Sequence, residues 1–479
     1  MQAYLGRPVY SLMMGTRLMI VLNSDQAVKD LLDKRSNIYS SRPDLYLPNI
    51  ISGSLRVVLM AYGETWRMIH RIYHNMLHVR SATAFIPYQD LENKQMMRGL
   101  LDSPDEFVDH IRRYTNSLTT QMVFGFRTFS NDDPKLKQLY YGFDKMVQVL
   151  GSTSAAFLDL YPALRELPDF LVPMRRYCKD LHAREKELYV GHWLDAKARI
   201  SNGTSKPCFC VDLVKAQKIE GFSDGLAAYI SGSLLEAGSD TTAAQLVGFV
   251  QAMVLFPEVQ NAAQRELDKV CGDRLPTLDD KLPYIRCCVK ECLRWMPTAI
   301  LGIPHSVIRE DEYMGYRIPK GCNVMLNVWA IHMDPKRHSN PRAFDPTRYE
   351  GDLQTAAEAT ANADASKRDH FGFGAGRRVC QGIHIAERSL TLGIARLLWA
   401  FQFRRSVDSN GRETVPDPED LTQGVLVQPR PFPVKIVPRS EAHACALREA
   451  WDSCQVLLDG EKQWKEVPEG MPFSTYTPE

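Results

Sequence analysis

Residues 373–382 read FGAGRRVCQG, a glycine-rich stretch that places one cysteine in front of a strongly periodic segment. The apolar residues of that segment recur at helical spacing, at Ile383, Ala386, Leu390, Ile394 and Leu397. Cys380 would therefore lie at a helix N-terminus, where free backbone N–H groups and the helix dipole favour the thiolate, and Arg377 and Arg378 add positive charge. A thiolate held in this way is a strong axial donor to haem iron.

Two alternative roles fit this stretch less well. A cysteine in a globular protein is usually a small buried hydrophobic residue. The glycines could belong to a dinucleotide-binding loop, but Gly372, Gly374 and Arg377 fail the third glycine of G-x-G-x-x-G, and no clear strand leads into them. Gly374 and Gly376 instead let the backbone fold tightly beside a flat macrocycle, because they carry no Cβ.

The stretch resembles the haem-binding motif of the cytochromes P450, which it matches at Phe373, Gly374, Gly376, Arg378, Cys380 and Gly382. The resemblance implies heme b as the cofactor, with Cys380 as the axial ligand of its iron. It also implies the cytochrome P450 fold, a single domain that is mainly α-helical with small β-sheets (α+β). In that fold the haem lies between a long oxygen-groove helix and the helix that follows the cysteine.

The whole chain has the composition of an ordinary globular protein. Its 479 residues are 44% hydrophobic and 24% charged, and a net charge of +1 gives no general electrostatic basis for binding nucleic acid. Its 11 cysteines form no disulfide framework, and neither Cys208/Cys210 nor Cys287/Cys288/Cys292 has the paired C-x-x-C spacing of a zinc site. We therefore expect reduced thiols that face the cytosol.

The sequence contains no run of about 18 apolar residues, which a membrane span would need. The first 23 residues predict a β-hairpin, with strands at Val9–Met13 and Leu18–Leu22, and no signal peptide or anchor precedes it. Microsomal members of the family begin with a membrane helix. By resemblance we expect a protein of the endoplasmic reticulum membrane, on its cytosolic face, in a truncated or late-starting form.

Helical patterns dominate the chain between residues 65 and 295. Before them we expect a helix that begins after Ser24 and a proline- and serine-rich loop at Ser40–Leu59. Short strands are predicted between Pro304 and Val328, and residues 351–368, which are poor in apolar side chains, predict an exposed insertion.

The end of the chain predicts one more amphipathic helix. Its apolar face consists of Leu447, Trp451, Cys454 and Leu458, and we expect it to serve packing alone. We therefore divide the chain into a monooxygenase domain at residues 1–438 and a C-terminal tail at residues 439–479.

Glu291 and Arg294 lie three residues apart on a predicted helix, where their side chains can pair. Such pairs usually sit on solvated faces, but this one is followed by residues 341–349, which read PRAFDPTRY. In cytochromes P450, an arginine at the position of Arg348 joins the pair in a buried triad that supports the cysteine loop. The resemblance thus gives these three residues a structural role, with Thr347 where the family commonly has glutamate.

Residues 237–242 (AGSDTT) place polar side chains inside a long predicted helix. Glycine inside a helix costs about 1 kcal/mol relative to alanine, and serine and threonine there often bend the helix by bonding to its backbone. The alternative is an accidental polar patch on a buried helix. The segment resembles the family's oxygen-binding groove, which puts Ala237 and Gly238 over the haem and makes Asp240 and Thr241 the catalytic acid–alcohol pair that relays protons.

Haem propionates need hydrogen-bond donors. The segment around Trp66 resembles the helix that touches one propionate in this family, through Trp66 and the residue four positions on, His70. Arginine is common at that second position and Arg71 is adjacent, so the choice between His70 and Arg71 stays open. By resemblance His305 and Arg378 are further propionate contacts, although a single histidine is more often an incidental polar residue.

The resemblance implies a haem-dependent monooxygenase, similar to the microsomal-type enzymes of fungal secondary metabolism. Electrons would come from NADPH through a separate NADPH–cytochrome P450 reductase, with cytochrome b5 as a further candidate partner, and one atom of O2 would enter the substrate. We expect a monomer. Basic side chains near Trp66 would form a docking face for an acidic reductase: Arg67, Arg71, His74, His78 and Arg80.

Two functions of other classes stay open at this point. A haem-thiolate isomerase or dehydratase would need no reductase, but such enzymes usually lack the acid–alcohol pair. A non-catalytic haem-binding sensor would need no long oxygen-groove helix.

The segments that would line the substrate pocket by resemblance are mainly apolar. They are Leu45–Leu59, Thr298–Ile303 and Gly424–Val427, together with Leu234 and Ala237. An unpaired charge among such residues would be costly. We therefore predict a neutral, mainly apolar organic substrate, such as a secondary-metabolite intermediate, oriented by one or two hydrogen bonds, with Thr298 as the first polar candidate.

Overall fold

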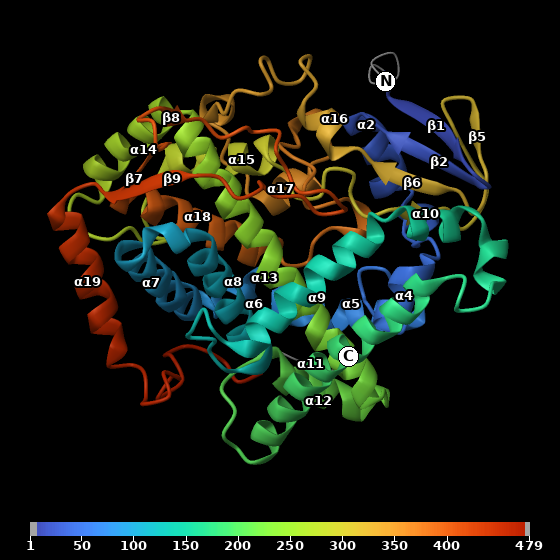
Figure 1. The fold of residues 1–479 in the computed structure, drawn as a ribbon, viewed down its shortest axis with the longest axis horizontal. Coiled ribbons are helices and arrows are strands. Elements are labelled where there is room, and N and C mark those ends of the chain that lie inside the picture. Colours follow the sequence, from blue (N-terminus) through green and yellow to red (C-terminus); the bar gives the residue numbers. More distant parts are fainter. Residues whose placement is uncertain (1–6, 475–479) are drawn as a thin grey trace.

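The computed structural model describes residues 7–474, and most of them lie in helices (Figure 1). Residues 1–6 and 475–479, which belong to the predicted domain and tail, lie outside the described range. Before the long central helix, the helices are α2 (Asp25–Val28), α3 (Ser36–Tyr39), α4 (Tyr46–Ser52), α5 (Glu64–Leu77), α6 (Val79–Thr83), α7 (Ile86–Asp102), α8 (Phe107–Phe124), α9 (Pro134–Leu150), α10 (Thr153–Leu160), α11 (Pro173–Ser201) and α12 (Phe209–Glu220).

The central helix is α13 (Asp224–Leu255), which runs through the middle of the molecule in Figure 1. Ser223 caps it, because its side chain accepts a hydrogen bond from the N–H of Leu226. The helices that follow are α14 (Pro257–Val270), α15 (Pro283–Trp295), α16 (Val328–His332), α17 (Ala356–Ala361), α18 (Ile383–Ala400) and α19 (Glu441–Gln455). The prediction of a mainly helical fold with small sheets is confirmed.

Three small sheets accompany the helices. The first has the order β1 (Val9–Met14), β2 (Arg17–Leu22), β6 (Asn323–Leu326) and β3 (His305–Ser306), and so joins the start of the chain to its last third. The predicted hairpin is confirmed to within one residue, with Val9 opposite Leu22. The other sheets are β4 (Asp311–Tyr313) with β5 (Tyr316–Ile318), and β8 (Glu413–Thr414) with β7 (Phe401–Val407) and β9 (Val434–Pro438).

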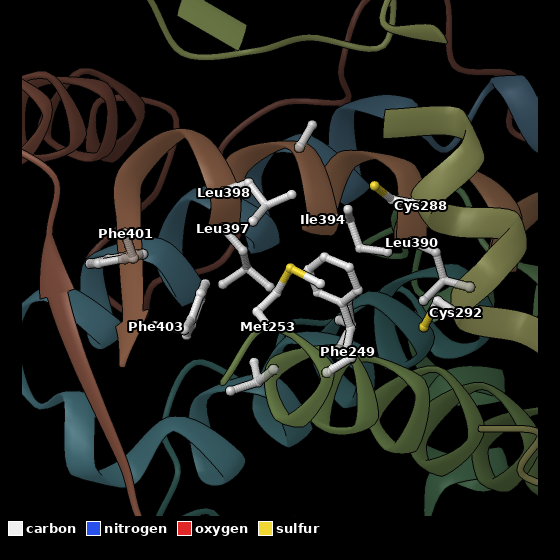
Figure 2. Packing of buried hydrophobic residues seen from close by; sticks show 14 of the residues in the cluster. Phe249, Met253, Cys288, Cys292, Leu390, Ile394, Leu397, Leu398, Phe401 and Phe403 are labelled. Carbon is white, nitrogen blue, oxygen red and sulfur yellow. The ribbon is translucent and has the colours of Figure 1, made fainter. Parts of the chain in front are cut away.

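The largest apolar core lies where α13, α15, α18 and β7 meet (Figure 2). Phe249 and Met253 of α13 pack between the sulfur-bearing face of α15 and the apolar face of α18. The two helices that flank the predicted haem site are therefore held by the same core, which makes their spacing rigid because protein interiors are close-packed.

Two segments differ from the sequence-based prediction. The loop predicted at Ser40–Leu59 contains α4, which buries Leu47 and Ile51 one helical turn apart. The predicted exposed insertion at residues 351–368 contains α17, which Thr355 and Glu358 begin with a capping box. Both helices are shorter than two full turns, so their periodicity is too brief to recognise in the sequence.

The C-terminal tail packs along the helical body. Three of the four predicted apolar residues of α19 and its continuation are buried: Leu447, Cys454 and Leu458. Farther on, the indole N–H of Trp464 donates to Gln121 Oε1 of α8 (2.6 Å), and Gln463 exchanges hydrogen bonds with the backbone of Arg127. Within residues 7–474, no single helix is long and apolar enough to cross a membrane. The helices α13 and α14 meet that test of length and composition only when they are counted as one segment, and they are sharply bent relative to each other.

Candidate functional site

The stretch around Cys380 forms a closed loop in front of α18. The N–H of Cys380 donates to the carbonyl of Phe373 (2.8 Å), and the N–H of Gly374 donates to the carbonyl of Phe371 (3.0 Å). Gly382 is the N-cap residue of α18, two residues after the cysteine. Among the described cysteines, only Cys380 and Cys445 are exposed, so the loop presents one accessible thiol at a helix start.

Gly376 is the residue that most restricts this loop. Its φ is +61°, and its N–H donates to Asp33 Oδ1 (2.7 Å). A Cβ at this position would lie 1.9 Å from the carbonyl oxygen of Leu32, closer than any real contact. The loop can therefore lie against the segment Lys29–Lys34 only with glycine at this position.

The protonation of Cys380 differs from the sequence-based expectation. The thiol is exposed at its own surface, yet the protein packed around it raises its pKa, and the N–H of Gly382 only partly offsets this. The two arginines point elsewhere: Arg377 bonds the hydroxyl of Tyr62 (2.5 Å), and Arg378 bonds the carbonyls of Ser40 (2.8 Å) and Met60 (2.7 Å). Neither arginine is among the causes of the pKa shift of Cys380, so the expectation that they push the thiol toward the thiolate was wrong.

The structure brings Glu291, Arg294 and Arg348 together. Arg294 makes a two-pronged ion pair with Glu291, with Nε–Oε2 and Nη2–Oε1 distances of 2.6 and 2.7 Å, and both side chains are fully buried. Arg348 joins more loosely, with its Nε 3.4 Å from Glu291 Oε1 and a second bond to the carbonyl of Asn340. Thr347 bonds Asp345 instead.

His332 connects this triad to the cysteine loop. Its Nε2 accepts the N–H of Phe371 (2.8 Å), so the proton is on Nδ1, which donates to the carbonyl of Arg294 (2.9 Å). Burial, with the charges of His370 and Arg294, lowers the pKa of His332 well below its usual range, so the ring is neutral. The sequence analysis missed this residue, because one histidine after a short strand carries no motif.

The face of α13 that carries Ala237 and Thr241 is open. Ala237 is exposed, Thr241 is partly exposed, and Thr241 Oγ1 donates to the carbonyl of Ala237 (2.8 Å). Gly238 faces α8, where a Cβ would lie 2.6 Å from Thr119 Oγ1, so close packing of two helices accounts for glycine there. Its predicted place over the haem stays a prediction.

Asp240 has different surroundings from Thr241. It is buried, and burial raises the pKa of its carboxyl to about 6; Arg112 on α8 opposes this shift, whereas Asp144 on α9 and Glu236 add to it. Next to it in α13, the carbonyl of Ser239 accepts hydrogen bonds from Thr115 Oγ1 (2.5 Å) and the Tyr140 hydroxyl (2.9 Å).

Two arginines, the buried Arg42 and the half-buried Arg378, lie close together without an acidic partner. Arg42, which the sequence analysis missed, donates to the carbonyls of Val58 (3.0 Å), Ile303 (2.6 Å) and Pro304 (2.8 Å). Burial, with the charge of Arg378, lowers the pKa of Arg42 well below its usual range, and burial lowers the pKa of Arg378 to about 10. No carboxylate within residues 7–474 forms an ion pair with either arginine, and positive charge removed from water is costly when it is left unpaired.

The other predicted propionate contacts surround these arginines. The guanidinium of Arg378 lies 4.2 Å from the ring centre of Trp66, and the rings of Trp66 and His70 are 4.8 Å apart. Arg71 instead lies 3.4 Å from Glu220 at the surface, which favours His70 in the choice left open above. His305 is buried and bonds the carbonyl of Tyr39 (2.7 Å), and burial lowers its pKa to about 3.

Comparison with known proteins agrees with this geometry. A family model described as Cytochrome P450 matches residues 2–436. Cytochrome P450 monooxygenase virE of Hypocrea virens is 54% identical over 475 residues, which covers 98% of this chain and 86% of that protein. Cytochrome P450 monooxygenase fsoB of Humicola fuscoatra is 52% identical over 474 residues, which covers 98% of this chain and 88% of that protein.

Solved structures show the same fold. A zebra fish cytochrome P450 with progesterone superposes with a TM-score of 0.73 at 23% identity, covering 90% of this chain and 96% of the other. A second zebra fish structure, with abiraterone, gives a TM-score of 0.69 at 22% identity, with coverage of 90% and 97%.

Proposed function

The chain belongs to the cytochrome P450 family of haem-containing monooxygenases, and on that basis we propose that Cys380 is the axial ligand of the haem iron. The observation that carries this proposal is the single exposed thiol on a rigid glycine loop in front of α18. Haem supplies the oxygen-activating chemistry, and a coordinating metal ion deprotonates a thiol outright, so the raised pKa of Cys380 is no obstacle.

The first experiment replaces Cys380 with serine. Cys380→Ser should abolish the red-shifted Soret band of the reduced carbon-monoxide complex, because an alcohol is a poor substitute for thiolate. Cys445→Ser, at the other exposed cysteine, is the matched control and should keep that band. A Cys380→Ser protein that retained the band would contradict the assignment of Cys380 as the axial ligand.

Arg42, Arg378 and the residues around them would hold the two haem propionates. Arg42 and Arg378 supply positive charge that lacks an acidic partner in the described chain, and Trp66, His70 and His305 border them. Phe373, Gly374 and Gly382 would shape the cysteine side of the site, and Ala237 and Gly238 the opposite side. Arg42→Leu should retain less haem than Arg71→Leu, whose arginine already pairs with Glu220.

Asp240 and Thr241 would move protons during oxygen activation. Asp240, with a pKa raised to about 6, can hold a proton near neutral pH, and the hydroxyl of Thr241 lies on the open face of α13. Thr241→Ala should still bind haem and consume NADPH but release more peroxide per product, and Thr241→Ser should restore coupling. Unchanged coupling in Thr241→Ala would instead assign the proton relay to Ser239 or Thr242.

The substrate would be a neutral, mainly apolar organic molecule, such as an intermediate of secondary metabolism. The predicted pocket segment Leu45–Leu59 contains Arg56, but Glu185 and Glu236 pair with this arginine, so it offers no free positive charge. The N–H of Val427 donates to the carbonyl of Thr298 (2.7 Å), which joins two of the predicted lining segments. Spectral titration of the ferric protein with matched analogues should show tighter binding of the neutral analogue than of the anion.

Electrons would come from NADPH through a separate reductase, with cytochrome b5 as a second candidate donor. Four of the five predicted docking residues are exposed on α5 and α6: Arg67, Arg71, His74 and Arg80. The rate of haem reduction by the reductase should fall steeply with ionic strength, because exposed charges are screened by salt. A reduction rate that does not depend on salt concentration would contradict docking of the reductase at this face.

The protein would act at the cytosolic face of the endoplasmic reticulum membrane. Large apolar side chains are exposed on the β1–β2 hairpin and beside α10, namely Met13, Phe157, Phe170 and Leu171. The two regions are adjacent, because the N–H of Thr16 donates to the carbonyl of Leu160 (3.3 Å). Such a patch fits a lipid surface, and Phe170→Ser with Leu171→Ser should reduce co-sedimentation with phospholipid vesicles.

A further inference from the structure

Arg56 forms a buried ionic cluster with carboxylates from two helices. Its guanidinium contacts Glu185 of α11 through Nη2 and Glu236 of α13 through Nη1. The side chain of Arg56 is only 2% exposed, and those of Glu185 and Glu236 are 9% and 10% exposed. The cluster therefore joins three segments that are far apart in the sequence: the connection Gly53–Gly63 between α4 and α5, and the helices α11 and α13.

The chain enters this connection through a tight turn. Gly53 and Ser54 both have left-handed backbone conformations, with φ of +55° and +61°, and the position of a Cβ at Gly53 lies 3.0 Å from the ring of His182. A serine in this conformation is strained and persists only when its surroundings hold it. The N–H of Ser54 donates to the carbonyl of Asn49 (2.8 Å), and the ion pairs of Arg56 hold the chain two residues farther on.

The residues after Arg56 belong to the site itself. The N–H of Val57 donates to Ser233 Oγ on α13 (3.4 Å), one turn before Ala237. The carbonyl of Val58 accepts from Arg42, and that of Met60 accepts from Arg378. The same short segment thus touches α13 and both arginines assigned to the propionates. The position of Arg56 therefore determines where this wall of the site lies.

We propose that Arg56 is a positioning residue for substrate binding, which holds the connection Gly53–Gly63 closed against α11 and α13. This inference rests on the proposed function, because the wall that Arg56 holds is that of the monooxygenase pocket. Arg56 acts through the connection and touches neither the cysteine loop nor Thr241.

The cluster carries more negative than positive charge, which makes its closure sensitive to pH. The groups that face Glu185 are Arg56, Glu236, Tyr189 and Tyr229, and His182 bonds the hydroxyl of Tyr229 (3.0 Å). Burial raises the pKa of Glu185, Arg56 opposes this, and Glu236 adds to it. A raised carboxyl pKa favours the protonated, closed cluster at low pH, and closure weakens as the pH rises through that pKa.

The decisive variant removes all three charges at once. Arg56→Met alone would leave two carboxylates buried together and could prevent folding. The triple variant Arg56→Met/Glu185→Gln/Glu236→Gln avoids this. The chain offers a matched control in the cluster of Glu92 with Arg113 and Arg127, which is equally buried and does not touch the connection. Its triple variant is Glu92→Gln/Arg113→Met/Arg127→Met.

Binding of tebuconazole, a neutral triazole, to the ferric holoenzyme provides the measurement. The Arg56 triple variant should keep its haem and its red-shifted carbon-monoxide band. Its dissociation constant should rise about tenfold, mainly through faster release of the ligand. The Glu92 triple variant should bind like the wild type. Equal affinities in both triple variants would overturn the inference.

A pH series separates positioning from simple stability. The dissociation constant of the wild type should rise from mildly acidic to mildly basic pH, and Glu185→Gln should hold it at the low-pH value throughout. A flat wild-type profile would overturn the role of charge in closure. A wild-type protein without the red-shifted band would instead refute the proposed function, whereas a normal band with unchanged variants refutes the positioning role alone.

Discussion

At the scale of the residue, backbone geometry determines the conformation of the cysteine loop as much as the chemistry of its side chains does. Gly376 is held by a left-handed φ of +61°, a hydrogen bond to Asp33 and the carbonyl of Leu32, which would meet any Cβ at 1.9 Å. Gly411 has a similar φ of +77° but open space around it. The two glycines therefore separate the effect of steric contact from that of backbone strain.

Gly376→Ala and Gly411→Ala should accordingly differ. Gly411→Ala carries only the strain of a left-handed residue, about 1–2 kcal/mol. Gly376→Ala adds a clash with a backbone atom, so it should displace the loop and reduce haem content as well as the unfolding free energy. Equal losses in the two variants, measured by urea unfolding and haem absorbance, would contradict the steric account.

A second residue-scale prediction concerns His332. His332→Leu leaves the N–H of Phe371 and the carbonyl of Arg294 without their partner, at about 1–3 kcal/mol for each buried group. The fraction of carbon-monoxide complex with the red-shifted band should fall, because Phe371 begins the cysteine loop. His192→Leu is the control: that histidine is also buried, but it stacks on Phe124 and Phe126 and has no partner at Nδ1.

Sequence analysis could find the residues whose roles are encoded in local spacing. Cys380, with its glycines, and Glu291 with Arg294 stand in short motifs, and the structure brings the latter pair together with Arg348. Arg42 and His332 were missed because their partners lie far away in the sequence or on backbone carbonyls. The charge balance around a side chain is a tertiary property and leaves no local pattern.

At the scale of the element, α15 carries one strong and one weak ion pair to the same carboxylate. Arg294 is fully buried and makes two short bonds to Glu291, and it also bonds the carbonyls of His332 and Pro341. Arg348 is 3.4 Å from Glu291 and its side chain is 10% exposed. The two arginines should therefore contribute unequally to the stability of the haem-loaded fold.

Substitution of the two arginines tests this order. Arg294→Ala leaves Glu291 buried without its main partner, which should cost about 3–5 kcal/mol, so little haem-loaded protein should be recovered. Arg348→Ala should cost less than half of that. Haem content and unfolding free energy are the measurements. Normal haem content with low activity in Arg294→Ala would contradict the structural role and imply a catalytic one.

Elements were predictable where their periodicity is long. The hairpin β1–β2 and the long helices α13 and α18 agree with the sequence within a few residues. The short helices α4 and α17 were not predicted, because fewer than two turns give a weak periodic pattern and their stability comes from tertiary packing.

At the scale of the whole molecule, buried histidines couple stability to pH. Burial lowers the pKa values of His192, His305, His332 and His338, those of His192, His305 and His338 to about 3. Groups with lowered pKa stabilise the fold above their ordinary pKa of about 6.5 and lose that contribution as the pH falls. Urea unfolding should therefore show lower stability in mild acid, and a pH-independent midpoint would contradict this.

The C-terminal tail supplies a second prediction at this scale. Trp464 is 8% exposed and bonds Gln121, so Trp464→Ala should cost about 3–5 kcal/mol of unfolding free energy. Val456, in the same tail, is 69% exposed, and Val456→Ala should stay within about 0.5 kcal/mol of the wild type. Equal, small effects would mean that the tail is only loosely attached to the body.

The unpaired charges of Arg42 and Arg378 have a consequence for the production of this protein in a cell. If the haem propionates are the counter-ions of these arginines, a newly made chain must enclose both cations before those counter-ions arrive, which would lower the stability of its native state until haem binds. A ligand that binds only the native state stabilises it by mass action, and chains that stay unfolded are removed by proteases. The steady amount of enzyme would then follow the supply of haem more closely than the level of its messenger RNA.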